Sequence, residues 1–378
     1  MEEPRKIVVI GATGNFGSRI CARLLGEPNT ELVVASRSSA NAEEFAGSLR
    51  ERRPDAIVST AVLDQSADSF EDDLLCLGAT VVIHTAGPYQ GQDYRVARAC
   101  IQCGSHYIDL ADGREFVRGF NALHRNAIEQ DVLLVSGAST LPGLSSAVIG
   151  ELENRFVSIR DIEISIAPAH QTPRGRATVA AVLSYCGKPF AVLENGDWVL
   201  RYGWQHLKTQ RYPDCGSRLS GACDVPDLVL FPDRFPGVET VTFHAALEAK
   251  WEQIALWLMA WVTRIGIIRN WDRMVRSFQW LSERLIRLGS ATGGMQIRLS
   301  GIGSGLEPKS VTWNLTAHQN HGPEIPCTPA LILARKLAAD QMPARGAYPC
   351  LGMITLAEFD SEVSDLDVRW KIDEGPAV

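Results

Sequence analysis

Three glycines near the N-terminus are spaced for holding a phosphate group. Gly11, Gly14 and Gly17 follow the apolar run 6–10 and precede residues 18–26, where apolar side chains recur at helical spacing. A strand, a glycine turn and a helix in this order are typical of a dinucleotide site, because the glycines bring the backbone and the helix N-terminus close to a pyrophosphate. We expect cofactor contacts from Gly11, Thr13, Gly14, Asn15, Phe16 and Gly17.

The second expected strand, residues 31–35, ends at Ser36, Arg37 and Ser38. An NAD enzyme usually carries Asp or Glu at this point, where it accepts a hydrogen bond from the ribose 2′-hydroxyl. Here a guanidinium stands between two hydroxyls, and Arg can bind a 2′-phosphate bidentately. The sequence therefore favours NADP over NAD. A solvated surface Arg remains the alternative reading of Arg37.

Strand and helix patterns alternate through the first 140 residues, and this alternation indicates an α/β fold with a doubly wound parallel sheet of the Rossmann type. Ligands bind beyond the carboxyl ends of such strands. This geometry predicts Asp64 near the adenine. It also predicts a segment near the nicotinamide that consists of Thr85, Ala86, Gly87 and Pro88.

Three polar residues near the expected nicotinamide end are candidates for catalysis. Tyr89 follows the Gly-Pro turn, and a phenol can donate a proton or orient a carbonyl. Asp109 and Asp112 come at the end of the next strand. Each has a structural alternative, which is packing under the ribose for Tyr89 and capping of the following helix for the two acids.

At this point the sequence resembles the saccharopine dehydrogenase-like oxidoreductases. The resemblance rests on GATGNFG at 11–17, Ser36-Arg37, HTAGPYQGQ at 84–92, ARACIQCGSHYIDLADGREFV at 97–117, GASTLPGLSSAVIGEL at 137–152, IPCTPALILARKLA at 325–338 and GAYPCLGMITLAEFD at 346–360. It implies an NAD(P)-binding Rossmann domain with an inserted α+β second domain and a C-terminal return to the first. We expect domains at 1–140 and 141–322, with residues 323–378 packing back on the first domain.

One stretch departs from the family pattern. The saccharopine-forming reductases carry Asp-Pro-Gly where this chain has Leu141-Pro142-Gly143. The missing carboxylate removes a partner for a substrate ammonium.

Taken together, the glycine turn, Arg37 and the resemblance predict an NADP-dependent oxidoreductase. It would transfer hydride to or from a C=N, C=O or activated C=C bond of an unidentified small molecule. The alternatives are a non-catalytic dinucleotide-sensing protein and an atypical short-chain reductase. The latter is disfavoured because no Tyr is followed by Lys four residues later.

The middle of the chain changes to strand patterns at residues 161–167, 225–231, 238–246, 296–302 and 309–318, which suit a mainly antiparallel sheet. Two arginines near an expected helix start could hold a carboxylate or phosphate, or could form a solvated basic turn. The predicted substrate-binding residues are Thr140, Arg174, Arg176 and Thr178.

Composition and charge limit which binding partners and which cellular compartment we expect. The chain has 378 residues, 46% of them hydrophobic and 21% charged, with a formal charge of −7, which argues against nucleic-acid binding. The nine Cys are scattered and the His show no ligand spacing, so we expect reduced thiols and no metal site. No signal peptide is evident, and the expected location is the cytoplasm. We expect a small-molecule substrate and a homodimer.

Five of the nine Trp lie between Trp251 and Trp280, in a segment expected to form helices over 250–289. Its apolar run at 254–268 is too short for the roughly 20 residues that span a bilayer. Residues 250–287 carry seven basic and three acidic side chains, a local charge of +4. We expect these helices to pack on the second domain or on a second subunit. A lid over an apolar substrate and peripheral membrane contact remain as alternatives.

Overall fold

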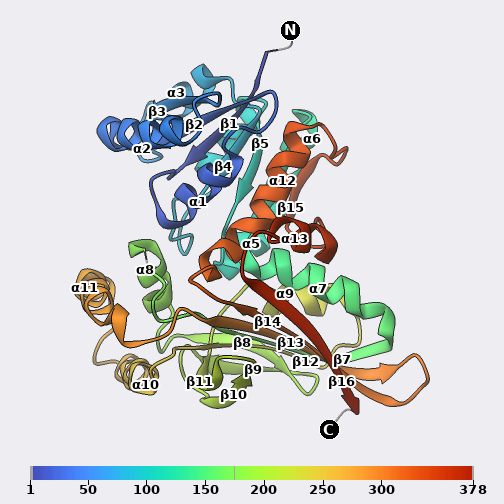
Figure 1. Cartoon of the computed structure of the whole chain (residues 1–378). Helices are drawn as coiled ribbons and strands as arrows, with labels where there is room; N and C mark the ends of the chain where they lie inside the picture. Colours follow the sequence, from blue (N-terminus) through green and yellow to red (C-terminus); the bar gives the residue numbers. More distant parts are fainter. Residues whose placement is uncertain (1–2, 174, 377–378) are drawn as a thin grey trace. The chain divides into compact units, whose positions relative to one another are not determined.

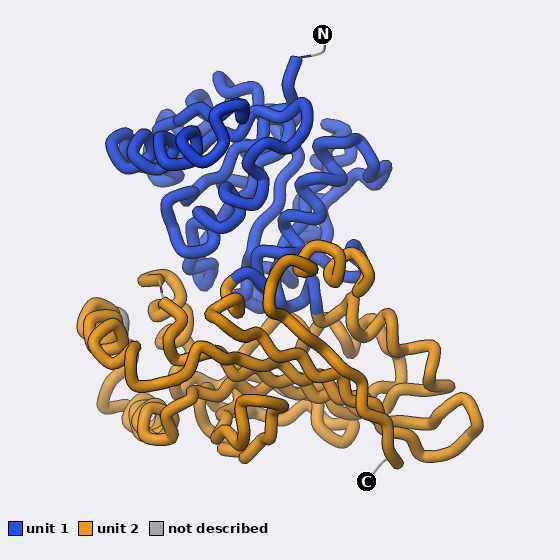
Figure 2. Tube along the Cα trace, in the orientation of Figure 1, with its two compact units in different colours: residues 1–144, 324–354 blue, residues 145–323, 355–378 orange. Residues whose placement is uncertain are grey.

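The computed structural model describes residues 3–173 and 175–376, and the chain forms two compact units (Figures 1 and 2). The first unit contains Met1–Leu144 and Glu324–Ile354. The second contains Ser145–Pro323 and Thr355–Val378. Each unit is built around its own sheet.

The first unit alternates strands and helices, as the sequence predicts. Its strands are β1 (Arg5–Ile10), β2 (Thr30–Ser36), β3 (Ile57–Val62), β4 (Val81–His84), β5 (His106–Asp109), β6 (Leu133–Ser136) and β15 (Gly346–Pro349). Its helices are α1 (Asn15–Leu24), α2 (Ser39–Arg52), α3 (Phe70–Leu77), α4 (Arg95–Gln102), α5 (Arg114–Arg118), α6 (His124–Glu129) and α12 (Thr328–Ala338), with short turns η1 (Gly119–Leu123) and η2 (Thr140–Leu144). The turn η6 (Gly322–Cys327) spans the point where the chain passes from the second unit back to the first.

The strands of this unit pair in the order β15-β6-β5-β4-β1-β2-β3, and every pair is parallel. Residues 7–10 of β1 and all of β4 are buried, as expected for strands covered on both faces. The strand order reverses between β1 and β4. The carboxyl ends of these two strands are therefore where a doubly wound sheet binds its ligand.

The expected C-terminal return to the first unit is shorter than predicted. Helix α12 packs against α1, β1, β4 and β5, and β15 pairs with β6. Residues 355–378 instead belong to the second unit, because strand β16 (Val368–Pro376) pairs antiparallel with β14 (Pro308–Ala317). The prediction that all of 323–378 packs on the first domain is therefore wrong for its last part.

The second unit is a nine-stranded mixed sheet with helices. Its remaining strands are β7 (Phe156–Ala167), β8 (Pro189–Glu194), β9 (Asp197–Tyr202), β10 (Lys208–Tyr212), β11 (Gly216–Ala222), β12 (Thr240–Ala246) and β13 (Gly293–Gly303). Its helices are α7 (Ser145–Leu152), α8 (Arg176–Ser184), α9 (Asp227–Arg234), α10 (Lys250–Arg264), α11 (Val275–Leu285) and α13 (Leu356–Glu362), with turns η3 (Glu153–Arg155), η4 (Asp272–Met274) and η5 (Ile286–Leu288). The pair β12–β7 is parallel, and the other pairs are antiparallel.

One predicted strand, residues 225–231, is wrong, because α9 occupies this segment. A short apolar run does not distinguish a buried strand from a buried helix. Pro226 and Asp227 open the helix, and the buried Asp227 carboxylate accepts a hydrogen bond from Ser145 on α7. Both residues are common in the first turn of a helix.

A substitution of Leu333 tests whether α12 is part of the hydrophobic core of the first unit. Its side chain is fully buried, so Leu333→Ala should lower the free energy of unfolding by about 2–5 kcal/mol. The exposed Gln341→Ala, just after the same helix, should stay within about 0.5 kcal/mol of the parent. Denaturant unfolding with hydrogen exchange to locate the affected unit measures both. Equal stability of the two variants would exclude α12 from that core.

Candidate dinucleotide-binding site

The glycine loop joins β1 to α1 in a conformation that suits these glycines. Gly11 has φ +79°, a backbone angle that residues other than Gly rarely adopt. A Cβ on Gly17 would lie 2.2 Å from the Gly11 carbonyl oxygen, so only Gly lets α1 lie this close to the loop. The Gly14 N–H closes the turn by donating to the Gly11 carbonyl at 2.9 Å.

Helix α1 begins directly after the loop, and no side chain caps its N-terminus. Gly14 is the N-cap residue, and its carbonyl accepts from the N–H of Ser18. The first-turn N–H groups of such a helix, together with its positive dipole end, favour an anion. Thr13 and Gly14 are exposed, so the turn is open to a ligand.

The segment after β4 lies against the glycine loop. The Thr85 hydroxyl donates to the carbonyls of Ile10 (2.9 Å) and Gly11 (3.2 Å). The Gln92 side-chain amide donates to the carbonyls of Ala86 (2.9 Å) and Pro88 (2.7 Å). These bonds hold the half-buried backbone of residues 85–88 beside the glycine turn, at the point where the strand order reverses.

The end of β2 presents one cation. Arg37 is exposed, and among the residues that the structure describes no hydrogen bond or ion pair engages its guanidinium. The neighbouring hydroxyls are used locally, because Ser36 accepts from the Ser38 N–H (3.3 Å) and Ser38 caps α2 by accepting from the Asn41 N–H (3.3 Å). Arg37 is therefore the side chain at this position that is open to a ligand.

Asp64 follows β3, the neighbouring strand. The Ser66 hydroxyl and N–H both donate to its carboxylate, at 2.6 and 3.0 Å. These bonds, with a smaller electrostatic contribution from Arg37, lower the pKa of Asp64. Asp64 is half-buried and builds the turn at residues 64–67.

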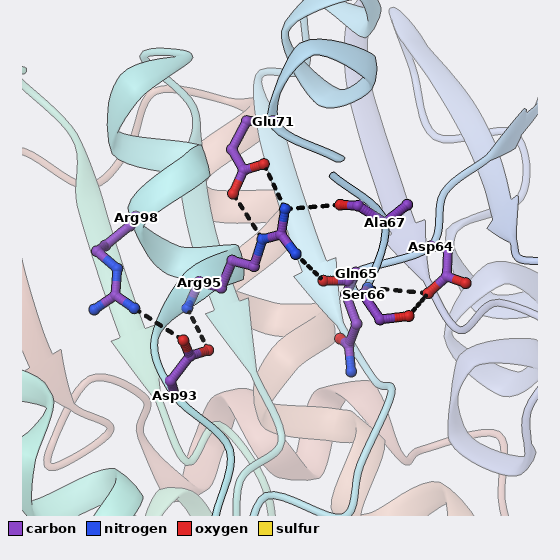
Figure 3. Close-up of polar contacts among 8 residues, drawn as sticks. All are labelled: Asp64, Gln65, Ser66, Ala67, Glu71, Asp93, Arg95 and Arg98. Carbon is purple, nitrogen blue, oxygen red and sulfur yellow. Dashed lines mark hydrogen bonds and ion pairs between the residues drawn. The ribbon is translucent and has the colours of Figure 1, made fainter. Parts of the chain in front are cut away.

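Arg95, the first residue of α4, holds this turn in place (Figure 3). Its guanidinium forms two 2.7 Å bonds to the Glu71 carboxylate and donates to the carbonyls of Gln65 (3.1 Å) and Ala67 (2.7 Å). The Arg95 bonds lower the pKa of Glu71 to about 2. Sequence reasoning missed this clamp, since its partners are two carbonyls and a Glu that lie 24–30 residues away.

His84 links the same turn to the sheet and was also not predicted. Gln65 Oε1 accepts from His84 Nε2 (2.9 Å), which leaves Nδ1 to accept from the Tyr107 hydroxyl (3.0 Å). Burial lowers the pKa of His84 to about 4, so the ring is neutral near pH 7. The buried His84 side chain thus links the end of β4 to Gln65 in the turn after β3.

The three predicted catalytic residues differ in their surroundings. The Tyr89 ring is 5% exposed, and its hydroxyl donates to the His84 carbonyl at 2.6 Å. Asp109 is fully buried, and its Oδ1 accepts from Ala111 N, Gly137 N and Ser136 Oγ at 2.8–3.1 Å. Asp112 is exposed and accepts from Gln90 Nε2 at 3.1 Å. Of the three, Asp112 alone has an exposed side chain; their catalytic roles stay predictions.

The predicted substrate residues fall in different units. Thr140 begins the turn after β6 in the first unit and is half-buried. Arg176 is the exposed first residue of α8, and Thr178 lies in the first turn of that helix, both in the second unit. Arg174 lies outside the described residues. Their use in substrate binding stays a prediction.

Metal-ligand chemistry finds no support in the part of the chain that the structure describes, where no group of three His, Cys, Asp or Glu side chains could hold a metal ion. The nine cysteines are free thiols. Burial raises the pKa of several of them, for example that of Cys223 to about 12.

The glycine turn, the uncapped α1 and the reversal of strand order define a Rossmann-type dinucleotide-binding domain. Residues 7–135 match the family model of the saccharopine dehydrogenase NADP binding domain. This part of the chain is therefore similar to that domain, which confirms the resemblance predicted from the sequence. The fold class predicted from the sequence is confirmed as well.

Relatives and a solved structure agree with this assignment. The trans-acting enoyl reductase of Mycobacterium tuberculosis is 27% identical over 140 residues, 36% of this chain and 33% of that protein. A saccharopine dehydrogenase-like oxidoreductase of Rattus norvegicus is 27% identical over 154 residues, 37% of this chain and 36% of that protein. The matched region is thus about a third of the length of these curated relatives.

The similarity in fold extends further than the similarity in sequence. The apo histidine-tagged saccharopine dehydrogenase (L-Glu forming) of Saccharomyces cerevisiae has a TM-score of 0.67 and 14% identity, and the match covers 98% of this chain and 100% of that chain. Both units therefore share the fold of that protein.

The pH dependence of stability tests the structural role of Asp109. Burial raises its pKa from 3.8 to about 6, so the folded protein keeps a proton that the unfolded chain has already released. Its contribution to stability is therefore full below pH 4 and is lost as pH rises to about 6, a loss of about 3 kcal/mol. Asp109→Asn cannot titrate and should lack this loss. Denaturant unfolding of both proteins from pH 4 to 7 measures this loss. A difference in free energy of unfolding between the two proteins that does not change with pH would contradict the structural role of Asp109.

Arg95→Ala should loosen the turn at residues 64–67. The variant loses the bonds to Glu71 and two carbonyls, so we expect lower stability and faster hydrogen exchange over 64–71. The control is Arg98→Ala, on the same helix, whose ion pair with Asp93 is half-exposed and should matter little. Unchanged exchange in the Arg95 variant would refute the clamp.

Proposed function

We propose that the protein is an NADP-dependent oxidoreductase acting on an unidentified small molecule. The observation that carries this proposal is the exposed Arg37 at the end of β2, in a unit whose glycine turn opens on α1. In that position an acid would select NAD, whereas a cation attracts the 2′-phosphate of NADP. The matched family model, an NADP-binding domain, supports the same cofactor.

The residues of the first unit have distinct roles in this proposal. The backbone of residues 11–17 receives the pyrophosphate, and Arg37 receives the 2′-phosphate. The turn at residues 64–67, fixed by Arg95 (Figure 3), flanks the adenine in this proposal. The backbone at 85–88 lies toward the nicotinamide. When bound, the cofactor supplies or accepts the hydride.

The acceptor class follows from the chemistry of hydride transfer. A C=N, C=O or activated C=C bond gains hydride at one atom and a proton at the other, so a proton source must be present. Asp112 fits this role better than Tyr89 and Asp109, because those two are buried and bonded within the unit. The name of the M. tuberculosis relative places enoyl substrates among the acceptors to test.

The same burial also favours a second candidate function. Since Tyr89 and Asp109 brace the loops, the first unit would still bind NADPH if it performed no reduction. This describes a dinucleotide-sensing protein. The two functions differ in turnover and not in cofactor affinity.

Cofactor preference tests the role of Arg37. Arg37→Asp should weaken NADPH binding about 10–100-fold through loss of a charge-assisted phosphate contact, while NADH binding should change little. Arg52→Asp, at the exposed far end of α2, is the matched control and should leave both affinities unchanged. Fluorescence titration of the reduced cofactors gives the constants. Equal affinity for NADH and NADPH in parent and variant would refute the 2′-phosphate contact.

Turnover separates the enzyme from the sensor. NADPH oxidation with imine, keto-acid and enoyl acceptors should proceed with at least one class, and Asp112→Asn should lower kcat with little change in the affinity for NADPH. Tight NADPH binding without oxidation by any acceptor would support the sensor instead.

A further inference from the structure

Helices α10 and α11 leave an unusually apolar surface exposed on the second unit. Of the large hydrophobic side chains that are exposed among the described residues, half lie between residues 251 and 288. We call the exposed side chains of residues 250–288 the α10–α11 surface. The predicted packing of these helices on their own domain accounts for only part of their apolar residues.

Helix α10 has two apolar faces. The face toward its own unit carries the buried Gln253, Leu256 and Ala260. A second row recurs at three- and four-residue spacing and stays exposed by 38–63%, and it consists of Trp251, Ile254, Leu258, Trp261 and Ile265. Within one unit nothing covers this second row among the residues described. A row of this kind indicates a partner outside the chain.

Helix α11 continues the pattern and adds charge. Leu281 of α11 and the residues seven positions before and after it, Met274 in η4 and Leu288 in η5, are 41–75% exposed. A neighbouring row is cationic and also exposed, and it consists of Arg273, Arg276, Arg284 and Arg287 with Trp280 between them. The Arg284 guanidinium lies 5.0 Å from the Trp280 ring centre. The apolar row is thus bordered by cations.

Polar contacts hold the ends of both helices to the loop that follows β7. His170, 5% exposed, donates through Nε2 to the Leu285 carbonyl at the end of α11 (2.9 Å), and its N–H donates to Glu248 just before α10 (3.1 Å). Glu248 also accepts from the Ser290 N–H (2.9 Å). Between the helices, the Trp271 indole donates to Thr263 (2.9 Å). The exposed rows therefore belong to anchored helices.

The charge on this surface favours an anionic membrane over a second copy of the chain as its binding partner. The basic residues Lys250, Arg264, Arg269, Arg273, Arg276, Arg284 and Arg287 are all exposed, and among the described side chains Glu283 is the exposed acid in the same segment. A two-fold contact with a second copy would bring the same cations together, which is unfavourable. An anionic lipid surface instead attracts the arginines and accepts Trp and Leu at its headgroup boundary.

We propose that the α10–α11 surface binds an anionic phospholipid membrane, with both helices lying in the plane of the interface. α10 has 15 residues, about 22 Å, and its length suits lying on a bilayer. In the part of the chain described, no helix is long and apolar enough to cross a membrane. The proposal does not depend on the cofactor or on catalysis.

Vesicle sedimentation with the full-length protein tests the proposal. We expect binding to vesicles of phosphatidylcholine and phosphatidylglycerol, at least about 10-fold weaker binding to phosphatidylcholine alone, and a blue shift of Trp emission on binding. Binding should weaken as salt rises. No binding to the anionic vesicles at low salt would overturn the proposal.

Three variants separate the contributions. Ile254→Ser with Leu258→Ser removes apolar contacts, and Arg276→Glu with Arg284→Glu reverses charge; each pair should lower vesicle affinity at least about 10-fold. The control, Trp198→Ser with Leu200→Ser, removes two equally exposed side chains from β9 of the same unit and should bind like the parent. Because all these positions are exposed, thermal melts should agree.

Two further outcomes would overturn the proposal. One is equal loss of vesicle binding in the β9 control, which would indicate nonspecific adsorption. The other is a concentration-dependent dimer, seen by analytical ultracentrifugation, that dissociates in the Ile254/Leu258 variant while vesicles do not compete for it. That result would make a second copy of the chain the occupant of the surface.

Discussion

The close approach of α1 to the end of β1 is the constraint on which the first unit depends. Gly17 lies over the Gly11 carbonyl, where a Cβ would come within 2.2 Å of the oxygen. The helix can therefore start directly after the turn, with its first N–H groups uncapped. Thr85 bonds the carbonyls of Ile10 and Gly11 and brings the end of β4 to the same place. One steric requirement thus brings together the candidate phosphate-binding turn and the segment predicted to lie near the nicotinamide.

Polar side chains around this turn mainly hold loops rather than face solvent. Arg95 holds the turn after β3, His84 joins that turn to β4 through Gln65, and Asp109 joins the ends of β5 and β6. Perturbed pKa values are a common sign of active sites, but structural networks perturb them as well. For His84 and Asp109 the first cause of the shift is burial, and their bonds run to the surrounding loops. Their titration therefore reports on stability.

The sequence predicted the parts of the molecule that have local signals. Strands β1 to β6 are short apolar runs between helices, and apolar residues alternate along β7, β12, β13 and β14. Strands β8 to β11 were missed and residues 225–231 were assigned the wrong element, because short runs carry little periodicity. The positions of Gly11, Gly17 and Arg37 at strand ends were predicted from the sequence, and their contacts with a cofactor stay predictions. Arg95 and Gln65 were not predicted, because their partners are set by tertiary contacts between distant loops.

Helix α10 shows why periodicity identifies an apolar face but not its partner. Trp251, Ile254, Leu258, Trp261 and Ile265 have the spacing of a packed helix face, and from sequence alone they suggest burial. The helix is in fact held by the opposite side, through Leu256 and Ala260. What distinguishes the two faces is exposure and charge: among the described residues the outer row stays exposed, and the Arg264 guanidinium lies 4.8 Å from the ring centre of Trp261 in that row. An apolar row that is exposed, anchored and flanked by cations matches the boundary of an anionic bilayer better than it matches a protein core, where the arginines would lose their hydration without gaining a carboxylate partner.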